Sequence, residues 1–334
     1  MDVAVIGLGL IGGSLLRALA AHGHRVTGYD LAEPTRAAAR ALAKAARVPP
    51  SADPGTRTIE IKGAWLVADS VAEAAAGADL VVLAVPLPAI PQVLAELADH
   101  PGLITDVTSV KGPVREFLRG RRFVGGHPMA GKESSSFLAS DPHLFDGCAW
   151  VLCLEPDDTG LADWLALAGL VTSIGARVVP ATATEHDETV ARISHVPHLL
   201  AAALANVLDD HPLAGTLAAG SFRDGTRVAA TRPELTAAMC GGNVAAVRRV
   251  LAGVVADLAS YDRDLSAADP IAALTDALRG PSDLRRAWPA AGGEPVQVPA
   301  DTRALLEWGR SGGWITEIAD TIRGLRPETG RNDF

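Results

Sequence analysis

The chain has 334 residues, of which 48% are hydrophobic and 21% charged, and its formal net charge is −9. This length suggests about two domains that can each bury a core, and the composition is too apolar for a disordered protein. The acidic balance, without any basic stripe, excludes a nucleic-acid-binding surface. No apolar stretch reaches the roughly 20 residues of a membrane-spanning helix. The three cysteines (148, 153 and 240) show no metal-ligand spacing, which indicates reduced thiols and a cytoplasmic protein.

The first 21 residues predict a strand, a tight turn and a helix. Strand formers at 3–6 run into three glycines (7, 9 and 12), and the apolar residues then repeat with a helical period. In a dinucleotide-binding turn, the first glycine allows the bend, the second admits the pyrophosphate, and the third lets the helix pack on the strand. The phosphate then lies at the helix N-terminus. The predicted cofactor-binding residues of this turn are Gly7, Gly9, Leu10, Ile11 and Gly12.

Asp30 ends the next predicted strand, 25–29, at about the 20-residue spacing expected for an acidic residue that binds the ribose of NAD. Its carboxylate would repel the additional phosphate of NADP, so the sequence favours NAD. Arg36 follows closely enough that some use of NADP stays open. The alternative interpretation is a glycine-rich turn in an α/β domain that binds no nucleotide.

Strands and helices alternate through the first 125 residues. This alternation predicts an α/β domain of the Rossmann type, with a doubly wound and mostly parallel sheet. Ligands of such sheets bind beyond the carboxyl ends of the strands, so the loops at Val85–Pro86, Thr108–Ser109 and His127–Pro128 should open toward the nicotinamide. The expected helices are 37–46 and 90–98, and the expected strands are 64–67, 78–85, 103–106 and 122–125.

The pattern changes near Pro180. A strand at 149–154, a helix at 161–174 and a strand at 176–179 complete the first domain, and the chain beyond them reads as helices without a convincing strand. We therefore predict an NAD-binding Rossmann domain over 1–180 and an all-α domain for substrate binding and dimerisation over 181–290. The tail, 291–334, stays unassigned. The expected helices of the second domain are 181–209, 213–219, 233–239 and 243–267.

His127 is the candidate general base. It follows a predicted strand on a glycine-flanked loop and precedes Pro128, which puts an imidazole near the reactive end of the cofactor. Histidine is well suited to remove a hydroxyl proton as hydride leaves the same carbon, because it titrates near working pH. Ser109, at the end of the preceding strand, can hydrogen-bond the same hydroxyl; its alternative role is a cap for the helix after Gly112.

The second domain carries a group of histidines and a group of arginines. His186, Asp187, His195 and His198 are conceivable metal ligands, but they lack a compact ligand spacing, so we predict no metal. The segment 220–227 is polar, glycine-bounded and holds two arginines, which suit bidentate binding of a carboxylate. Solvated surface arginines are the alternative.

Taken together, the motifs resemble those of the prephenate and arogenate dehydrogenases of tyrosine biosynthesis. The resemblance covers roughly 1–280, with the motifs in the order of that family. They are Gly-Leu-Gly-Leu-Ile-Gly-Gly-Ser (7–14), Thr-Asp-Val-Thr-Ser-Val-Lys (105–111), Gly-Gly-His-Pro-Met-Ala-Gly (125–131), Glu-His-Asp (185–187), Ser-His-Val-Pro-His (194–198) and Phe-Arg-Asp-Gly-Thr-Arg-Val-Ala (222–229).

The resemblance implies a role for each motif. His127 would be catalytic and would act with Ser109 on the ring hydroxyl of prephenate, while NAD accepts hydride and carbon dioxide leaves. The helical domain would form a homodimer. Val85 and Pro86 would complete the cofactor site. The substrate-binding residues would be His198 in the pocket, Arg227 on a carboxylate, Asp187 paired with that arginine, Glu133 as a gate, and Ser194 and Thr226 from the same motifs.

Two departures and two alternatives accompany this interpretation. The segment after the Thr-Arg motif reads Pro-Glu-Leu-Thr (233–236) where some members have a tryptophan, and the tail is too short for a complete ACT domain. A β-hydroxyacid-type dehydrogenase would use a lysine in its second domain, but 181–334 contains none. A non-catalytic NAD-binding sensor would need neither His127 nor Ser109. The sequence does not decide between prephenate and arogenate, or whether tyrosine inhibits.

Overall fold

The computed structural model describes residues 1–46, 64–131, 136–289 and 292–327. The chain divides into two compact units, and each is described by itself. Unit 1 consists of Met1–His186 and Pro295–Leu325, and unit 2 consists of Asp187–Glu294 with the residues from Arg326 on. The last part of the chain, left unassigned by the sequence, therefore returns largely to unit 1.

The first sheet of unit 1 has six parallel strands in the order β3-β2-β1-β4-β5-β6. This is the strand order of dinucleotide-binding folds, and it confirms the predicted fold class. The order changes direction beside β1, so the turn after β1 faces the end of β4. The strands are β1 (Asp2–Ile6), β2 (Arg25–Tyr29), β3 (Trp65–Val67), β4 (Leu80–Leu83), β5 (Leu103–Asp106) and β6 (Phe123–Val124).

Helices cover both faces of this sheet, because successive strand residues point to opposite sides. Val3 and Val5 belong to one buried cluster, which contains the apolar side of α1, while Ala4 and Ile6 belong to the other. The buried runs in β4 and β5 thus follow from a sheet without a solvent face. The helices are α1 (Leu10–Ala21), α2 (Glu33–Ala46), α3 (Val71–Ala75), α4 (Ile90–Glu96) and α5 (Gly112–Phe117), with short 3₁₀ turns at Leu87–Ala89 and Phe137–Ala139.

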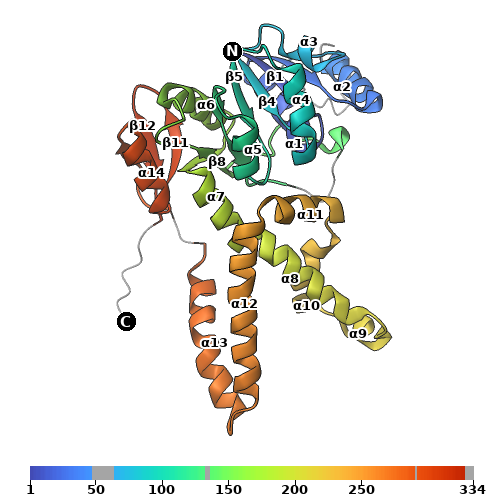
Figure 1. The fold of residues 1–334 in the computed structure, drawn as a ribbon, viewed down its shortest axis with the longest axis vertical. Helices are drawn as coiled ribbons and strands as arrows, with labels where there is room; N and C mark the ends of the chain where they lie inside the picture. Colours follow the sequence, from blue (N-terminus) through green and yellow to red (C-terminus); the bar gives the residue numbers. More distant parts are fainter. Residues whose placement is uncertain (47–63, 132–135, 290–291, 328–334) are drawn as a thin grey trace, which may run out of the picture. The chain divides into compact units, whose positions relative to one another are not determined.

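A second sheet completes unit 1, in the order β10-β12-β11-β9-β8-β7. Figure 1 labels its strands β8, β11 and β12. Strands β7, β8 and β9 come from the middle of the chain, where β8 and β9 are parallel and joined by α6, and β10, β11 and β12 come from its last part. The sequence did not predict a separate sheet. Its elements are β7 (Gly126–Pro128), β8 (Ala149–Cys153), α6 (Leu161–Ser173), β9 (Arg177–Ala181), β10 (Val296–Val298), α14 (Thr302–Arg310), β11 (Trp314–Ile318) and β12 (Ile322–Leu325).

Unit 2 is helical, as predicted, and among its described residues the only β pairing is the isolated bridge between Gly292 and Pro327. Helices α12 and α13 form a hairpin (Figure 1). The sequence missed α13, because Pro281 lies inside it and reads as a break. The helices are α7 (Ala183–Val190), which crosses the unit boundary, α8 (Val196–Ala205), α9 (Pro212–Leu217), α10 (Gly220–Thr226), α11 (Pro233–Gly242), α12 (Val244–Leu265) and α13 (Pro270–Ala287).

The core of unit 2 is small. It consists of Ala191, Val196, Ala246 and Val247, with further side chains packed against them. Many large apolar side chains stay exposed, among them Leu213, Val255, Leu258, Ile271 and Leu284. No single described helix is long and apolar enough to cross a membrane; the bent pair α11 and α12 meets the length and composition criteria only when both are taken together.

Candidate active site

The turn after β1 can be built only from glycine at two positions. Gly7 has a φ of +98°, and a Cβ atom there would lie 2.4 Å from the carbonyl oxygen of Ala84, at the end of β4. A Cβ atom on Gly12 would lie 1.9 Å from the carbonyl oxygen of Gly7. The bend and the close approach of α1 are therefore both built into the backbone, as the sequence predicted.

The N-terminus of α1 suits an anionic group. Its N-cap residue, Gly9, is extended, and among the described residues no side chain caps this end of the helix. Backbone N–H groups and the positive end of the helix dipole attract phosphate at such a position. Leu10, in the first turn, is buried, and Ile11 packs against the main core cluster. The structure thus offers a cradle that fits the pyrophosphate of a dinucleotide.

Asp30 lies next to this turn because β2 pairs with β1. Its carboxylate accepts hydrogen bonds from the N–H groups of Leu8, at 2.8 Å, and of Ala32, at 2.9 Å. The carboxylate therefore stabilises the glycine turn itself and presents a negative charge beside it. Such a charge fits the ribose hydroxyls of NAD.

Arg36 is held by its own surroundings. Its guanidinium donates to the carbonyl oxygens of Asp30, at 2.7 Å, and Leu31, at 3.0 Å, forms an ion pair with Glu33, and lies 5.6 Å from the centre of the Tyr29 ring. Binding a phosphate of NADP would require this arginine to exchange some of these contacts.

Val85 and Pro86 follow β4, as predicted. Val85 is half-buried, and its Cγ1 atom lies 3.0 Å from the position of a Cβ atom on Gly7, whereas Pro86 is exposed. The end of β4 therefore adjoins the glycine turn, which is the arrangement expected of one cofactor site.

A buried ion pair lies at the end of β5. Asp106 is 0% exposed and Lys111 is 1% exposed, and the ammonium group donates to the carboxylate. Asp106 also accepts hydrogen bonds from the N–H groups of Thr108, at 3.0 Å, and Gly126, at 3.1 Å, and Lys111 donates to the Gly126 carbonyl oxygen at 2.6 Å. One buried pair thus fixes the residues that precede Ser109 and His127. Both residues belong to the motif at 105–111, but their pairing could not be predicted from the sequence.

His127 lies inside β7, opposite Val151, and not on a loop as the sequence predicted. The chain leaves the first sheet after β6 and enters the second at Gly126. A Cβ atom on Gly126 would lie 2.6 Å from the Asp106 carbonyl oxygen, so glycine is required at this crossing. The expected loop is a strand because the neighbouring strand β8 comes from a part of the chain that local sequence does not reveal.

The imidazole of His127 meets a second histidine. Its Nδ1 atom lies 2.8 Å from Nε2 of His186 on α7, with the rings 5.1 Å apart and inclined at 72°. His127 is half-buried, and His186 is 2% exposed. Only one of two facing ring nitrogens can carry the proton, so one histidine donates and the other accepts. His186 belongs to the Glu-His-Asp motif, from which the sequence did not predict a contact with His127.

Ser109 is half-buried in the bend after β5. The first helix after it, α5, begins at Gly112 with Lys111 as its N-cap residue, so the alternative role of Ser109 as that cap is wrong. Its neighbour Thr108 is fixed on both sides, by Asp106 and through a hydroxyl hydrogen bond of 2.9 Å to the Val110 carbonyl oxygen. The segment that carries Ser109 is therefore well anchored.

Ser194 and His198 lie where the helix path of unit 2 is irregular. Residues Ala191–His195 form a π-helical turn, which is explained by Pro197, since proline has no N–H group to continue the regular ladder. Nδ1 of His198 donates to the Ser194 carbonyl oxygen at 2.8 Å, which leaves Nε2 as the acceptor in the neutral ring. Both residues are half-buried.

The remaining predicted residues of unit 2 are distributed over three places. Asp187 is nearly buried, and its carbonyl oxygen accepts a 2.7 Å hydrogen bond from Asn243. Thr226 ends α10 and donates to the Phe222 carbonyl oxygen, so most of the polar, glycine-bounded segment 220–227, for which the sequence predicted no helix, is helical. Arg227 is exposed at the start of the following 3₁₀ turn.

Two further predictions concern Glu133 and metal binding. Glu133 lies outside the described residues. Within the described ranges, no group of three or more His, Cys, Asp or Glu side chains could hold a metal ion. The structure instead joins His186 to His127.

Comparison with protein families gives two matches that divide the chain near the end of β9. Residues 15–180 match the family model described as prephenate dehydrogenase, nucleotide-binding domain, and residues 182–270 match prephenate dehydrogenase, dimerization domain.

Individual relatives support the same family assignment. A cyclohexadienyl dehydrogenase of Zymomonas mobilis is 34% identical over 271 residues, which are 77% of this chain and 85% of the relative. A prephenate dehydrogenase of Lactococcus lactis is 36% identical over 180 residues, 49% of each chain, so the chain spans about half the length of that relative. A crystal structure of a Corynebacterium glutamicum protein is 34% identical, covers 86% of this chain and 90% of that chain, and superposes with a TM-score of 0.74.

Proposed function

Because this chain belongs to the prephenate dehydrogenase family, we propose that it catalyses the NAD-dependent oxidative decarboxylation of prephenate to 4-hydroxyphenylpyruvate in tyrosine biosynthesis. The observation that carries the proposal is the contact between His127 and the buried His186. It orients the imidazole of the residue that follows Gly126, whose backbone is bound by the ion pair of Asp106 and Lys111 at the carboxyl end of β5 in a dinucleotide-binding sheet.

The cofactor site fits NAD. The pyrophosphate would bind at the glycine turn and the N-terminus of α1, with Gly7, Gly9, Leu10, Ile11 and Gly12. Asp30 would bind the ribose, and Val85 and Pro86 would line the site where β4 ends. When bound, NAD supplies an acceptor for the hydride that leaves the hydroxyl-bearing ring carbon.

His127 serves as the base. When its Nδ1–H donates to His186, its Nε2 atom carries no proton and can accept one from the substrate hydroxyl, with Ser109 hydrogen-bonded to the same oxygen. The carbon that loses hydride becomes a ketone, and the carbon–carbon bond to the ring carboxylate then breaks. The electron pair of that bond makes the ring aromatic, carbon dioxide leaves, and the phenolic oxygen takes the proton back.

The substrate-binding residues are proposed from the family motifs. Arg227 would bind a substrate carboxylate and pair with Asp187, while His198, Ser194 and Thr226 would line the pocket. The exposed guanidinium of Arg227 and the acceptor nitrogen of His198 suit a dianionic substrate that also carries a hydroxyl group. Glu133 would gate the site.

The first test is NADH formation with prephenate and arogenate, each offered with NAD and with NADP. The alternative activity, arogenate dehydrogenase, requires faster turnover of arogenate. A protein that binds NAD but turns over neither substrate would contradict the proposal and favour a sensor.

The role of His127 has a separate test. His127→Asn removes the base, and we expect turnover to fall about 100-fold to 10,000-fold. Binding of NAD, measured by titration, should stay within about twofold, because the glycine turn is unchanged. Equal losses of turnover and NAD binding would contradict the assignment.

We further propose that the chain is a homodimer through its helical unit. The exposed apolar side chains of α12 and α13, such as Val255, Leu258, Ile271 and Leu284, support this assembly, as does the match to a dimerization domain. Sedimentation at equilibrium measures it. The cytoplasmic location stays a prediction.

A further inference from the structure

The segment from Pro295 to Leu325 lies beyond residue 270, where the matched family models end. It contributes β10, α14, β11 and β12 to the same sheet that contains His127 in β7. Its apolar residues Leu305, Leu306 and Ile315 belong to the main core cluster of unit 1. The segment is therefore an integral part of the unit that holds the proposed base.

The end of α14 lies against the chain just before α7. A Cβ atom on Gly309 would lie 1.9 Å from the carbonyl oxygen of Pro180, so the two backbones are in direct contact. The next residue is Arg310, and its Nε atom donates to Oε1 of Glu185 at 2.6 Å. The backbone contact fixes where α14 lies, and the ion pair extends it into the first turn of α7.

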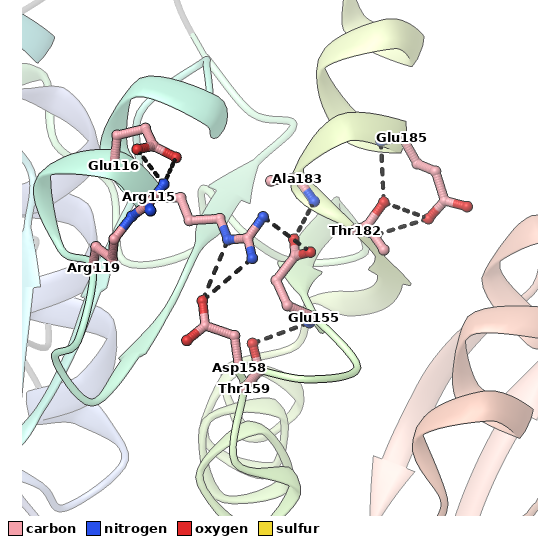
Figure 2. Close-up of polar contacts among 9 residues, drawn as sticks. All are labelled: Arg115, Glu116, Arg119, Glu155, Asp158, Thr159, Thr182, Ala183 and Glu185. Carbon is pink, nitrogen blue, oxygen red and sulfur yellow. Dashed lines mark hydrogen bonds and ion pairs between the residues drawn. The ribbon is translucent and has the colours of Figure 1, made fainter.

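Glu185 also takes part in the N-terminal capping of α7, in which Thr182 is the N-cap residue. Its Oε2 atom accepts hydrogen bonds from the N–H of Thr182, at 2.8 Å, and from the Thr182 hydroxyl, at 2.9 Å, while its own N–H donates to that hydroxyl at 3.2 Å. This is a reciprocal capping box (Figure 2). Burial alone would raise the pKa of Glu185, but the hydrogen bonds from Thr182 and the charge of Arg310 lower it below its ordinary value.

A second carboxylate holds the same turn. Glu155, after β8, accepts the N–H of Ala183 at 2.6 Å, and Arg115 forms an ion pair with it at 3.5 Å (Figure 2). The start of α7 is thus held from α5, β8 and α14. The residue that follows Glu185 is His186, which contacts His127.

We propose that Arg310 is a positioning residue, which holds Glu185 and the first turn of α7 so that His186 stays hydrogen-bonded to His127. The kinetic part of this proposal rests on the proposed function, whereas the structural part does not. Arg310 acts at a distance from the reaction, through the capping box of the helix that carries His186.

The test compares Arg310→Ala and Arg310→Lys with the control Arg303→Ala. Arg303 lies on the same helix and pairs with Glu307 four residues on, so its removal costs an arginine and an ion pair without touching α7. Nitrogen-15 NMR of the histidine rings reports which nitrogen of His127 and His186 carries the proton, and His127→Asn and His186→Asn assign the signals. Steady-state kinetics give kcat and KM.

We expect Arg310→Ala to replace the single tautomer of His127 by a mixture and to lower kcat about tenfold, with KM for NAD changed less than about twofold. Arg310→Lys should restore part of both effects, and Arg303→Ala should match the parent protein. Unchanged histidine signals in folded Arg310→Ala would overturn the proposal, whatever its activity. If the parent protein turns over neither prephenate nor arogenate, the proposed function fails while the NMR comparison still decides the role of Arg310.

Discussion

Unit 1 buries its apolar residues, whereas unit 2 exposes many of its own. The main cluster of unit 1 runs from Val3 in β1 to Ile322 in β12 and includes residues of both sheets. The described part of unit 2 has a cluster of four buried residues, and Leu258 and Ile271 on its long helices are 54% and 80% exposed. Since burial of apolar surface is the dominant favourable term in folding, the large core of unit 1 is expected to make this unit stable on its own.

The buried polar groups of the two units also differ in what they hold in place. In unit 1, the ion pair of Asp106 and Lys111 is fully buried and binds backbone groups of Gly126. In unit 2, Asn243 donates to the Asp187 carbonyl oxygen at 2.7 Å and lies 3.3 Å from Nδ1 of His195. The first arrangement fixes the segments that carry Ser109 and His127, and the second holds helices together. We therefore expect a substitution in the buried ion pair of unit 1 to change stability directly, and a substitution on the exposed apolar faces of unit 2 to act through assembly.

The largest effect is expected for Asp106→Ala. It leaves the ammonium of Lys111 buried without its carboxylate, which costs about 3–5 kcal/mol of unfolding free energy. Urea denaturation measures the loss, and Glu116→Ala, which breaks an exposed ion pair on α5, is the control that should leave the midpoint unchanged. A loss below about 1 kcal/mol for Asp106→Ala would show that the interior of unit 1 tolerates a buried ammonium without its carboxylate.

Next comes Leu258→Lys on α12, which puts a charge into the proposed dimer interface. We expect the dissociation constant of the dimer to rise about tenfold or more, measured by sedimentation equilibrium. Leu66→Lys on β3 is the matched control, because Leu66 is 60% exposed in unit 1, close to the 54% of Leu258. If both variants weaken the dimer equally, the apolar face of α12 is not the interface.

A smaller effect is expected at two matched helix caps. Asp269 accepts the N–H of Ala272 at the start of α13, and Asp301 accepts the N–H of Ala304 at the start of α14. Each substitution to alanine should cost about 1 kcal/mol. Hydrogen exchange should show lost protection in unit 2 for Asp269→Ala and in unit 1 for Asp301→Ala. Loss spread over both units in either variant would mean that the units unfold together.

The features that sequence predicted correctly are local. The strand, turn and helix around Gly7 and Gly12 are recognisable because each glycine meets backbone within a few residues or at the end of a neighbouring strand. The helical character of unit 2 follows from periodicity. Two helices were missed: α13, because Pro281 lies inside it, and α10, because its glycine-bounded, polar sequence favours a connection. The residues named for cofactor and substrate were found by motif, and their roles stay predictions.

The features that sequence missed depend on distant pairing. Strand β10 has three residues, of which only Val298 is buried, and β11 joins β9 through a pair of residues, Ile315 and Val178, far apart in the chain. No local pattern indicates such a partner. His186 was visible in its motif, but its contact with His127 requires β7 and α7 to meet. Arg310 belongs to none of the sequence motifs.

The smallest effect concerns thiol reactivity and compares one cysteine from each unit. Burial raises the pKa of Cys148 to about 11, and burial also raises the pKa of Cys240, though less strongly. At about pH 8 roughly one Cys148 thiol in a thousand is the reactive thiolate. We therefore expect iodoacetamide to modify Cys240 in unit 2 before Cys148 in unit 1, as followed by mass spectrometry. Denatured protein, in which both thiols should react alike, is the control. Faster modification of Cys148 would mean that unit 1 opens more readily than unit 2, against the difference in their cores.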